Sequence, residues 1–190
     1  MKKLILCLIL SFQVIEARAI LFEPYIFTSY GEATHPNESE SPKMFAHGVG
    51  ASVLFSLIPM LSAGLSADYR LYSQMSDVKS PYGNRTGKRL AIHPTLGLKL
   101  GPAFFKYYYQ AFGDYELDNE TSSGEKLTYT DVSGHSFWLS FPVFPLTRVG
   151  VFYELEKYSK YENGSTEVDL STSNNELEFN KFGIYLSILL

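Results

Sequence analysis

Eleven ionisable residues of both charge signs recur at alternate positions in segments that are otherwise rich in Gly, Ser and Thr. They are Asp68, Arg70, Arg89, His93, Lys99, Lys106, Asp114, Arg148, Glu154, Glu156 and Lys181. Charged side chains persist inside a protein when they are paired and hydrogen-bonded. We therefore expect these residues to form a structural salt-bridge network in the interior.

His135 and Ser136 are the residues most similar to a base and nucleophile pair. Neighbouring residues in a strand point to opposite faces, so these two side chains cannot pair with each other. The neighbour of His135 on the same face is Phe137, and the chain has no G-x-S-x-G motif. The sequence thus predicts no catalysis. A lipid-modifying barrel enzyme stays open as an alternative, because catalytic groups are recognised by geometry.

No metal, cofactor or nucleic-acid site is expected from the sequence. Four histidines are scattered without metal-ligand spacing: His35, His47, His93 and His135. Gly48-x-Gly50 is not followed by a helical pattern, so it is no dinucleotide motif. The formal net charge is −4, whereas a nucleic-acid surface needs clustered Lys and Arg.

The N-terminus resembles a secretory signal. Lys2 and Lys3 precede the apolar stretch 4–12, and Ala17-Arg18-Ala19 matches the A-x-A cleavage pattern. The apolar stretch is shorter than the roughly 20 residues of a spanning helix. We therefore expect residues 1–19 to be a cleaved signal peptide, which contains the single cysteine Cys7, and residues 20–190 to form one domain.

From residue 20 onward the chain divides into eight segments in which apolar residues occupy every second position. In 89–100, Leu90, Ile92 and Leu96 share one face, while His93 and other polar or small residues occupy the opposite one. This period predicts β-strands. The eight segments are 20–32, 45–56, 61–72, 89–100, 104–116, 127–141, 147–160 and 181–190. In 20–32 and 127–141 the alternation is less regular, and a shift by one residue would exchange the faces.

The gaps between the segments alternate in length. Long polar gaps cover 33–43, 73–88, 117–126 and 161–174, and short gaps with Pro or Gly cover 57–60, 101–103 and 142–146. An antiparallel membrane barrel with both termini in the periplasm has this arrangement of short turns and long external loops. The predicted fold is all-β, an eight-stranded antiparallel up-and-down transmembrane β-barrel.

The composition of the polar face favours a membrane barrel over a soluble lipocalin-like barrel, which remains the second alternative. A soluble barrel carries charge on its outer face, whereas here the polar face is mostly Gly, Ser and Thr and suits a narrow lumen. We expect aromatic residues at both membrane interfaces. Those near short turns are Phe55, Phe105 and Phe141, and those near long loops are Tyr30, Tyr69, Tyr115 and Tyr129.

With its leader, the opening Glu23-Pro24-Tyr25-Ile26 and the closing segment 181–190, the chain resembles the small outer-membrane barrels of the OmpA, OmpX and OmpW type. The resemblance implies a location in the outer membrane of a Gram-negative cell envelope. It also implies that the C-terminal strand is a signal for the barrel-assembly machinery, although Leu190 stands where that family usually has an aromatic residue.

A barrel of this type would contact outer-membrane lipid with its apolar face. We expect a structural, adhesive or minor permeability role, with the external partner left open and contacted through the long loops. A porin-like pathway through the charged residues is the alternative to a plugged lumen, but eight strands leave little open space.

Overall fold

A computed structural model describes residues 20–34, 41–75, 85–118, 127–163, 166–171 and 176–190. The predicted signal peptide, 1–19, and much of the four predicted long loops lie outside the described residues. None of the described residues forms a helix long and apolar enough to cross a membrane. The strands are β1 (Ile20–Thr34), β2 (Lys43–Ile58), β3 (Leu61–Met75), β4 (Arg85–Leu100), β5 (Ala103–Gln110), β6 (Phe112–Asp118), β7 (Leu127–Phe144), β8 (Thr147–Asn163), β9 (Thr166–Asp169) and β10 (Leu177–Ile188).

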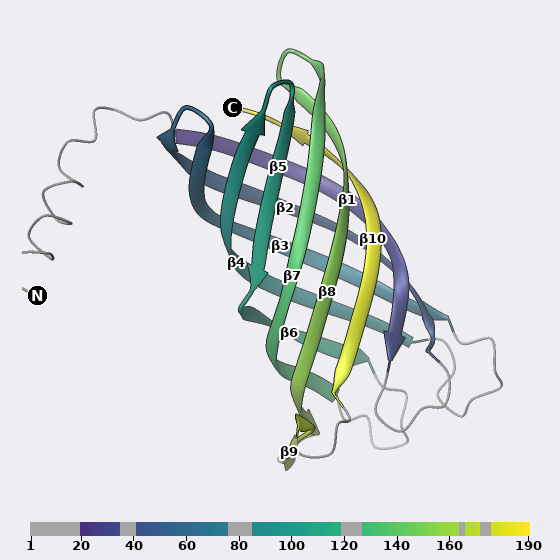
Figure 1. The fold of residues 1–190 in the computed structure, drawn as a ribbon. Coiled ribbons are helices and arrows are strands. Elements are labelled where there is room, and N and C mark those ends of the chain that lie inside the picture. Colours follow the sequence, from purple (N-terminus) through teal and green to yellow (C-terminus); the bar gives the residue numbers. More distant parts are fainter. Residues whose placement is uncertain (1–19, 35–40, 76–84, 119–126, 164–165, 172–175) are drawn as a thin grey trace, which may run out of the picture.

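The strands form a closed antiparallel ring (Figure 1). β1 to β4 pair in chain order, β7 pairs with β8, β8 with β10, and β1 closes the ring by pairing with β10. β5 and β6 are two parts of one ring position, because both pair with β4 on one side and β7 on the other. β9 pairs only with the end of β8. The ring therefore has eight strand positions, which confirms the predicted up-and-down barrel.

The apolar face of the wall points outward. Along β10 the side chains alternate strictly between buried and exposed. Phe182 and Ile184 are 56% and 54% exposed, whereas the flanking Lys181 and Tyr185 are buried. A soluble barrel hides its apolar face inside, so the observed orientation is that of a barrel surrounded by lipid.

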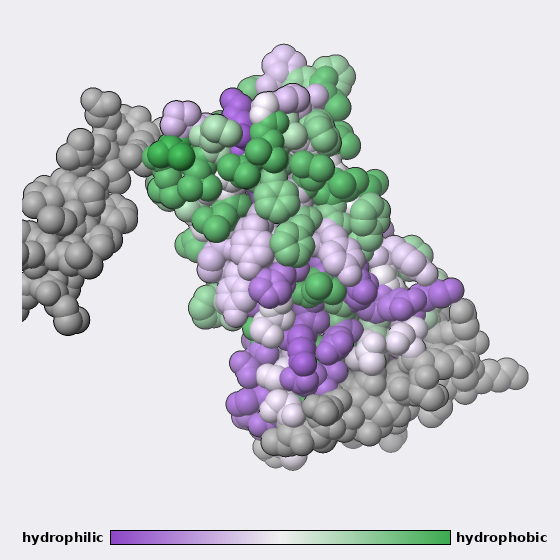
Figure 2. Space-filling model, in the orientation of Figure 1, coloured by the Kyte–Doolittle hydropathy of each residue, from purple (hydrophilic) through white to green (hydrophobic). Residues whose placement is uncertain are grey.

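The two ends of the barrel differ. Short turns join β2 to β3, β4 to β5 and β7 to β8 at the end where β1 starts and β10 finishes (Figure 1). Gly101 has a φ of 60° in the β4–β5 turn, a conformation that glycine adopts without strain. β1 and β7 have 15 and 18 residues, more than the roughly 9–11 that cross a membrane. The strands therefore continue beyond the apolar belt at the loop end, where the surface is hydrophilic (Figure 2).

A β-bulge between β5 and β6 corrects part of the predicted interior. Tyr108 lies opposite Thr95 and Phe112 opposite Ile92, so the β5–β6 side contains one extra residue. An extra residue exchanges the two faces beyond it. Asp114 is therefore exposed on the outer face, and its predicted interior position is wrong.

The same exchange of faces moves two predicted interface tyrosines into the lumen. Tyr115 is completely buried, and Tyr129, its partner across β6 and β7, is 6% exposed. In β7 the exchange occurs at Asp131, whose φ of 57° lies in the left-handed region and whose carboxylate accepts a hydrogen bond from Ser159. The expectation that Tyr115 and Tyr129 belong to an aromatic girdle is wrong.

Candidate functional site

The candidate site is the filled interior of the barrel, in which polar and aromatic layers follow one another along the axis. Register places Glu23 and Lys106 nearest the turn end, followed by a cluster of aromatic rings. A network of charged side chains comes next, and a second aromatic cluster fills the loop end. Every layer is built from residues at alternate positions of the strands, because only these side chains point inward.

Arg70 is the centre of the first half of the charged network. Its Nε donates to Asp68 Oδ1 at 2.5 Å, and its Nη1 donates to Glu154 Oε2 at 2.6 Å. His93 Nε2 lies 2.7 Å from the other oxygen of Asp68. All four side chains are buried. The carboxylates of Asp68 and Glu154 both bind Arg70, and Asp68 also contacts the imidazole of His93.

Glu156 is the centre of the second half. It accepts hydrogen bonds from Arg89 Nη1 and, at 2.8 Å, from Lys181 Nζ. Gln110 joins the two halves, because its Oε1 accepts from Arg89 Nη2 at 2.6 Å while its Nε2 donates to Glu154 at 2.8 Å. Gln110 was not among the residues that the sequence predicted for the network.

The network balances its charges. Three cations, Arg70, Arg89 and Lys181, meet three carboxylates, Asp68, Glu154 and Glu156, and all six side chains are buried. Removing one partner would leave an uncompensated buried charge, which is strongly unfavourable. The arrangement therefore fixes these side chains in place and fills the lumen at the level of the network.

Lys106 forms a separate pair closer to the turn end. Its Nζ donates to Glu23 Oε2 at 3.0 Å, and it lies 5.1–5.5 Å from the centroids of four rings. These rings belong to Tyr25, Tyr108, Trp138 and Tyr185. Aromatic faces attract cations, so the rings support the ammonium group in addition to its ion pair. Glu23 was missed because the alternation of the first segment is irregular.

Glycines make room for the aromatic rings of this layer. A Cβ on Gly48 would overlap the ring of Phe27, and a Cβ on Gly183 would overlap the ring of Phe152. Trp138 stacks on Phe152 with ring centroids 4.3 Å apart and an interplanar angle of 11°. The glycine positions thus allow the close packing of a narrow lumen.

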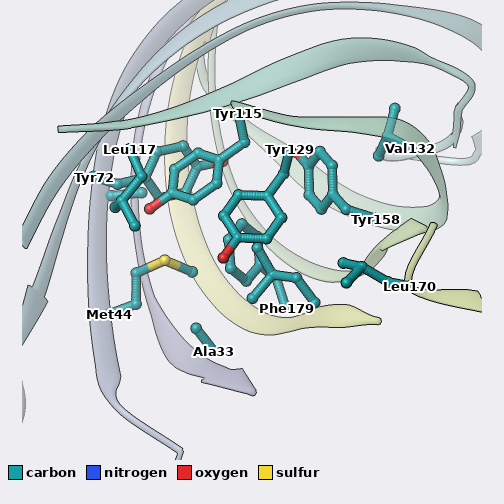
Figure 3. Packing of buried hydrophobic residues seen from close by; sticks show 12 residues of the cluster. Ala33, Met44, Tyr72, Tyr115, Leu117, Tyr129, Val132, Tyr158, Leu170 and Phe179 are labelled. Atoms are coloured by element: carbon teal, nitrogen blue, oxygen red, sulfur yellow. The ribbon is translucent and has the colours of Figure 1, made fainter. Parts of the chain in front are cut away.

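The loop end is closed by an aromatic cluster rather than by charge. Figure 3 shows Tyr115, Tyr129, Tyr158 and Phe179 converging in the interior of the barrel. Tyr115 lies 5.0 Å from Phe179 in an edge-to-face arrangement and accepts a hydrogen bond from Gln74 at 3.0 Å. The outer surface at the loop end of the barrel is hydrophilic (Figure 2).

Besides Asp114 and Lys106, two further predicted interior residues lie outside the network. Lys99 is exposed, because it is the second-last residue of β4 and lies where the lumen opens at the turn end. Arg148 is half-buried at the start of β8, and its guanidinium carbon lies 4.8 Å from the ring centroid of Phe104. The prediction that Lys99 and Arg148 join the salt-bridge network is therefore wrong, since both lie at the mouth of the barrel.

The candidate catalytic residues are separated as expected. His135 points outward and its Nδ1 lies 2.7 Å from the hydroxyl of Tyr107, whereas Ser136 is buried and accepts a hydrogen bond from Trp138 Nε1. Ser133, which sequence reasoning overlooked, is exposed on the same face as His135. Among the described residues, no carboxylate forms a hydrogen bond or ion pair with His135, and no group of three or more His, Cys, Asp or Glu could hold a metal.

Fold and interior together define a small transmembrane β-barrel with a filled lumen. Solved structures with this fold include Neisserial surface protein A, at 12% identity and a TM-score of 0.62, covering 88% of this chain and 96% of that one. They also include Ail, the attachment invasion locus protein of Yersinia pestis, at 10% identity and a TM-score of 0.53, covering 90% of this chain and 99% of Ail. At this identity the likeness concerns the fold alone.

No family model matches the chain, and no curated protein matches its sequence. The fold is that of the small bacterial outer-membrane β-barrels, which confirms the resemblance inferred from the strand pattern. The outer-membrane location predicted from the sequence agrees with these neighbours.

Proposed function

We propose that the protein is a closed, non-catalytic outer-membrane barrel with a structural or adhesive role carried by its external end. The observation that carries this proposal is the interior: a balanced network of buried charges lies between two aromatic clusters. Such a lumen favours a closed barrel over a porin-like one. The residues left to contact partners are then those that project from the membrane.

The external strand ends offer a scaffold for such contacts. β8 continues into the short strand β9, and Lys160 donates a hydrogen bond to Glu167 across this pair at 2.8 Å. The hydrogen bond and charge of Glu167 raise the pKa of Lys160, so the ion pair is formed at neutral pH. Leu170 anchors this hairpin in the aromatic cluster of the ring, while Glu167 and Asp169 are exposed and are suited to present a surface.

The charge of the predicted loops indicates which kind of external partner is favoured. Ail has been solved in complex with the heparin analogue sucrose octasulfate, a polyanion. In this chain the gaps 35–40, 76–84 and 119–126 together contain five acidic and two basic residues. Like charges repel, so a neutral or basic partner suits this barrel better than a sulfated polysaccharide.

The absence of catalysis is proposed on geometric grounds. The imidazole of His135 bonds Tyr107, and Ser136 lies on the opposite side of the wall. A nucleophile needs a base within hydrogen-bond reach, which neither residue supplies to the other.

Lipid and assembly factors are the proposed partners in the membrane. The exposed face of β10 carries Phe182, Ile184, Leu186 and Ile188, which suits contact with acyl chains. The same alternation suits recognition of the C-terminal strand by the barrel-assembly machinery.

Planar-bilayer recordings test closure. The purified folded protein should give no stable conductance at applied voltages of either sign. Channels of uniform conductance would contradict the proposed closed barrel.

Adherence tests the adhesive role. Bacteria displaying the full chain should adhere to host-cell surfaces more than bacteria displaying a variant without residues 166–171. Equal adherence of both strains and of a strain carrying the empty vector would exclude adhesion and leave the structural role.

A further inference from the structure

The mouth of the barrel at the turn end contains a small pocket of about 180 Å³. Residues from six strands line it, among them Leu21, Ser62, Lys99, Phe104 and Arg148. The turn between β2 and β3 covers it with Pro59 and Met60. We propose that this pocket is a binding site for a phosphate group, held by Arg148 and Lys99.

The two cations of the pocket differ from every other interior cation. Arg70, Arg89, Lys106 and Lys181 each form an ion pair with a carboxylate inside the lumen. Within the described part of the chain, neither Lys99 nor Arg148 has such a partner. Two neighbouring positive groups without a counter-charge favour an anion at this place.

The guanidinium of Arg148 contacts an aromatic ring and has one buried nitrogen without an acceptor among the described residues. It lies over the ring of Phe104, which limits its orientation. Its Nη1 is buried and has no hydrogen-bond partner. Ser187, directly opposite Arg148 on β10, also has a buried hydroxyl without a partner. A buried donor without an acceptor is costly, so an acceptor from outside the chain would stabilise this arrangement.

The chemistry of the pocket indicates the class of ligand. An arginine fork and a lysine ammonium are a common pair of phosphate ligands, the first by bidentate hydrogen bonds and the second as a point charge. Leu21 and Leu189 provide apolar walls that suit an ester of phosphate. A lipid headgroup from the periplasmic leaflet and inorganic phosphate share this chemistry.

The test uses the folded full-length barrel in maltoside detergent, which contains no phosphate. Inorganic phosphate is titrated by calorimetry, and binding of short-chain phosphatidylglycerol is then measured by native mass spectrometry. Arg148→Gln and Lys99→Gln should each weaken binding about tenfold or more, because each removes a charge-assisted hydrogen bond. Lys160→Gln removes the same charge at the opposite end and should leave binding unchanged. Slower migration after boiling verifies that each variant is folded.

Preferential binding of phosphatidylglycerol would identify a headgroup site, and equal binding of both probes would identify a site for the phosphate group itself. The proposal is overturned if neither probe binds, if the two variants bind as well as Lys160→Gln, or if acetate competes as strongly as phosphate. The last result would assign the pocket to carboxylates of a periplasmic peptide.

Discussion

The half of the barrel toward the turns and the half toward the loops have opposite patterns of apolar and polar residues, and β10 shows both patterns. Near the turn end, Phe182 and Ile184 point outward while Lys181 points into the lumen. Near the loops, Glu178 and Asn180 point outward while Leu177 and Phe179 are buried inside. One strand therefore changes from the pattern of a membrane protein to that of a soluble protein within a few residues.

The difference shows how the interior changes with the surroundings of the wall. Where lipid covers the outside, the outward residues are apolar, and the interior combines buried ion pairs and hydrogen bonds with the aromatic cluster around Trp138. Where water covers the outside, the interior can close with an apolar cluster of Tyr, Phe and Leu residues. We call these two regions the lipid zone and the water zone.

The largest effect is expected from breaking the charge network of the lipid zone. Glu156→Ala leaves Arg89 and Lys181 without their shared carboxylate, so the free energy of unfolding should fall by about 3–5 kcal/mol. Urea titration in detergent micelles measures this value. Lys88→Gln, which breaks an exposed ion pair with Glu116, is the control and should change little. An equal fall in the free energy of unfolding in both variants would show that the buried network contributes no more than an exposed ion pair.

A lysine placed on the outer face of β10, once in the lipid zone and once in the water zone, tests the difference between their surroundings. Leu186→Lys places an ammonium in the lipid zone and should cost about 2–4 kcal/mol of folding free energy in bilayers. Asn180→Lys, on the same strand and face but in the water zone, should be nearly neutral. Equal tolerance of both lysines would mean that the boundary between the zones is misplaced.

Close packing in the lipid zone is tested by adding one methyl group. Gly183→Ala brings a Cβ into the ring of Phe152 and should destabilise the barrel by about 1–3 kcal/mol. The temperature at which the unboiled form disappears in electrophoresis reports this loss. Phe182→Leu on the outer face is the control, because lipid adapts to its shape. If Gly183→Ala were as stable as the unmutated protein, the side chains in the lumen would be packed less closely than in the structure.

The smallest effect is expected in the water zone. Phe179→Leu keeps most of the apolar volume of the aromatic cluster, so the free energy of unfolding should fall by less than about 1.5 kcal/mol. Urea titration compares this variant with Glu156→Ala. A loss as large as that of Glu156→Ala would make the aromatic cluster, rather than the charge network, the main closure.

Much of the fold could be read from the sequence because strand alternation is local. The inward positions of Asp68, Arg70, Glu154, Glu156 and Lys181 follow directly from the period of two. Which cation meets which carboxylate could not be read, because it depends on side chains from strands far apart in the chain. Arg70 and Glu154, for example, are separated by 84 residues.

The errors have two physical causes. Asp114 was misplaced because the bulge at Ala111 to Gly113 exchanges the faces. Polar residues keep even positions on both sides of the bulge, from Lys106 to Asp114, so the period of two carried no signal of the exchange. Lys99 and Arg148 were misplaced because alternation reports direction but not depth along the barrel axis. A residue can point inward and still lie at an open end.

Fluorescence quenching tests the central claim most directly, which is that lipid covers the apolar face and the lumen is filled. Trp138 is the single tryptophan and is buried in the lumen, so acrylamide should not quench it in the native protein. In a Trp138→Phe background, Ile184→Trp should be quenched by lipids with brominated acyl chains but not by acrylamide. Strong acrylamide quenching at both positions would contradict the account.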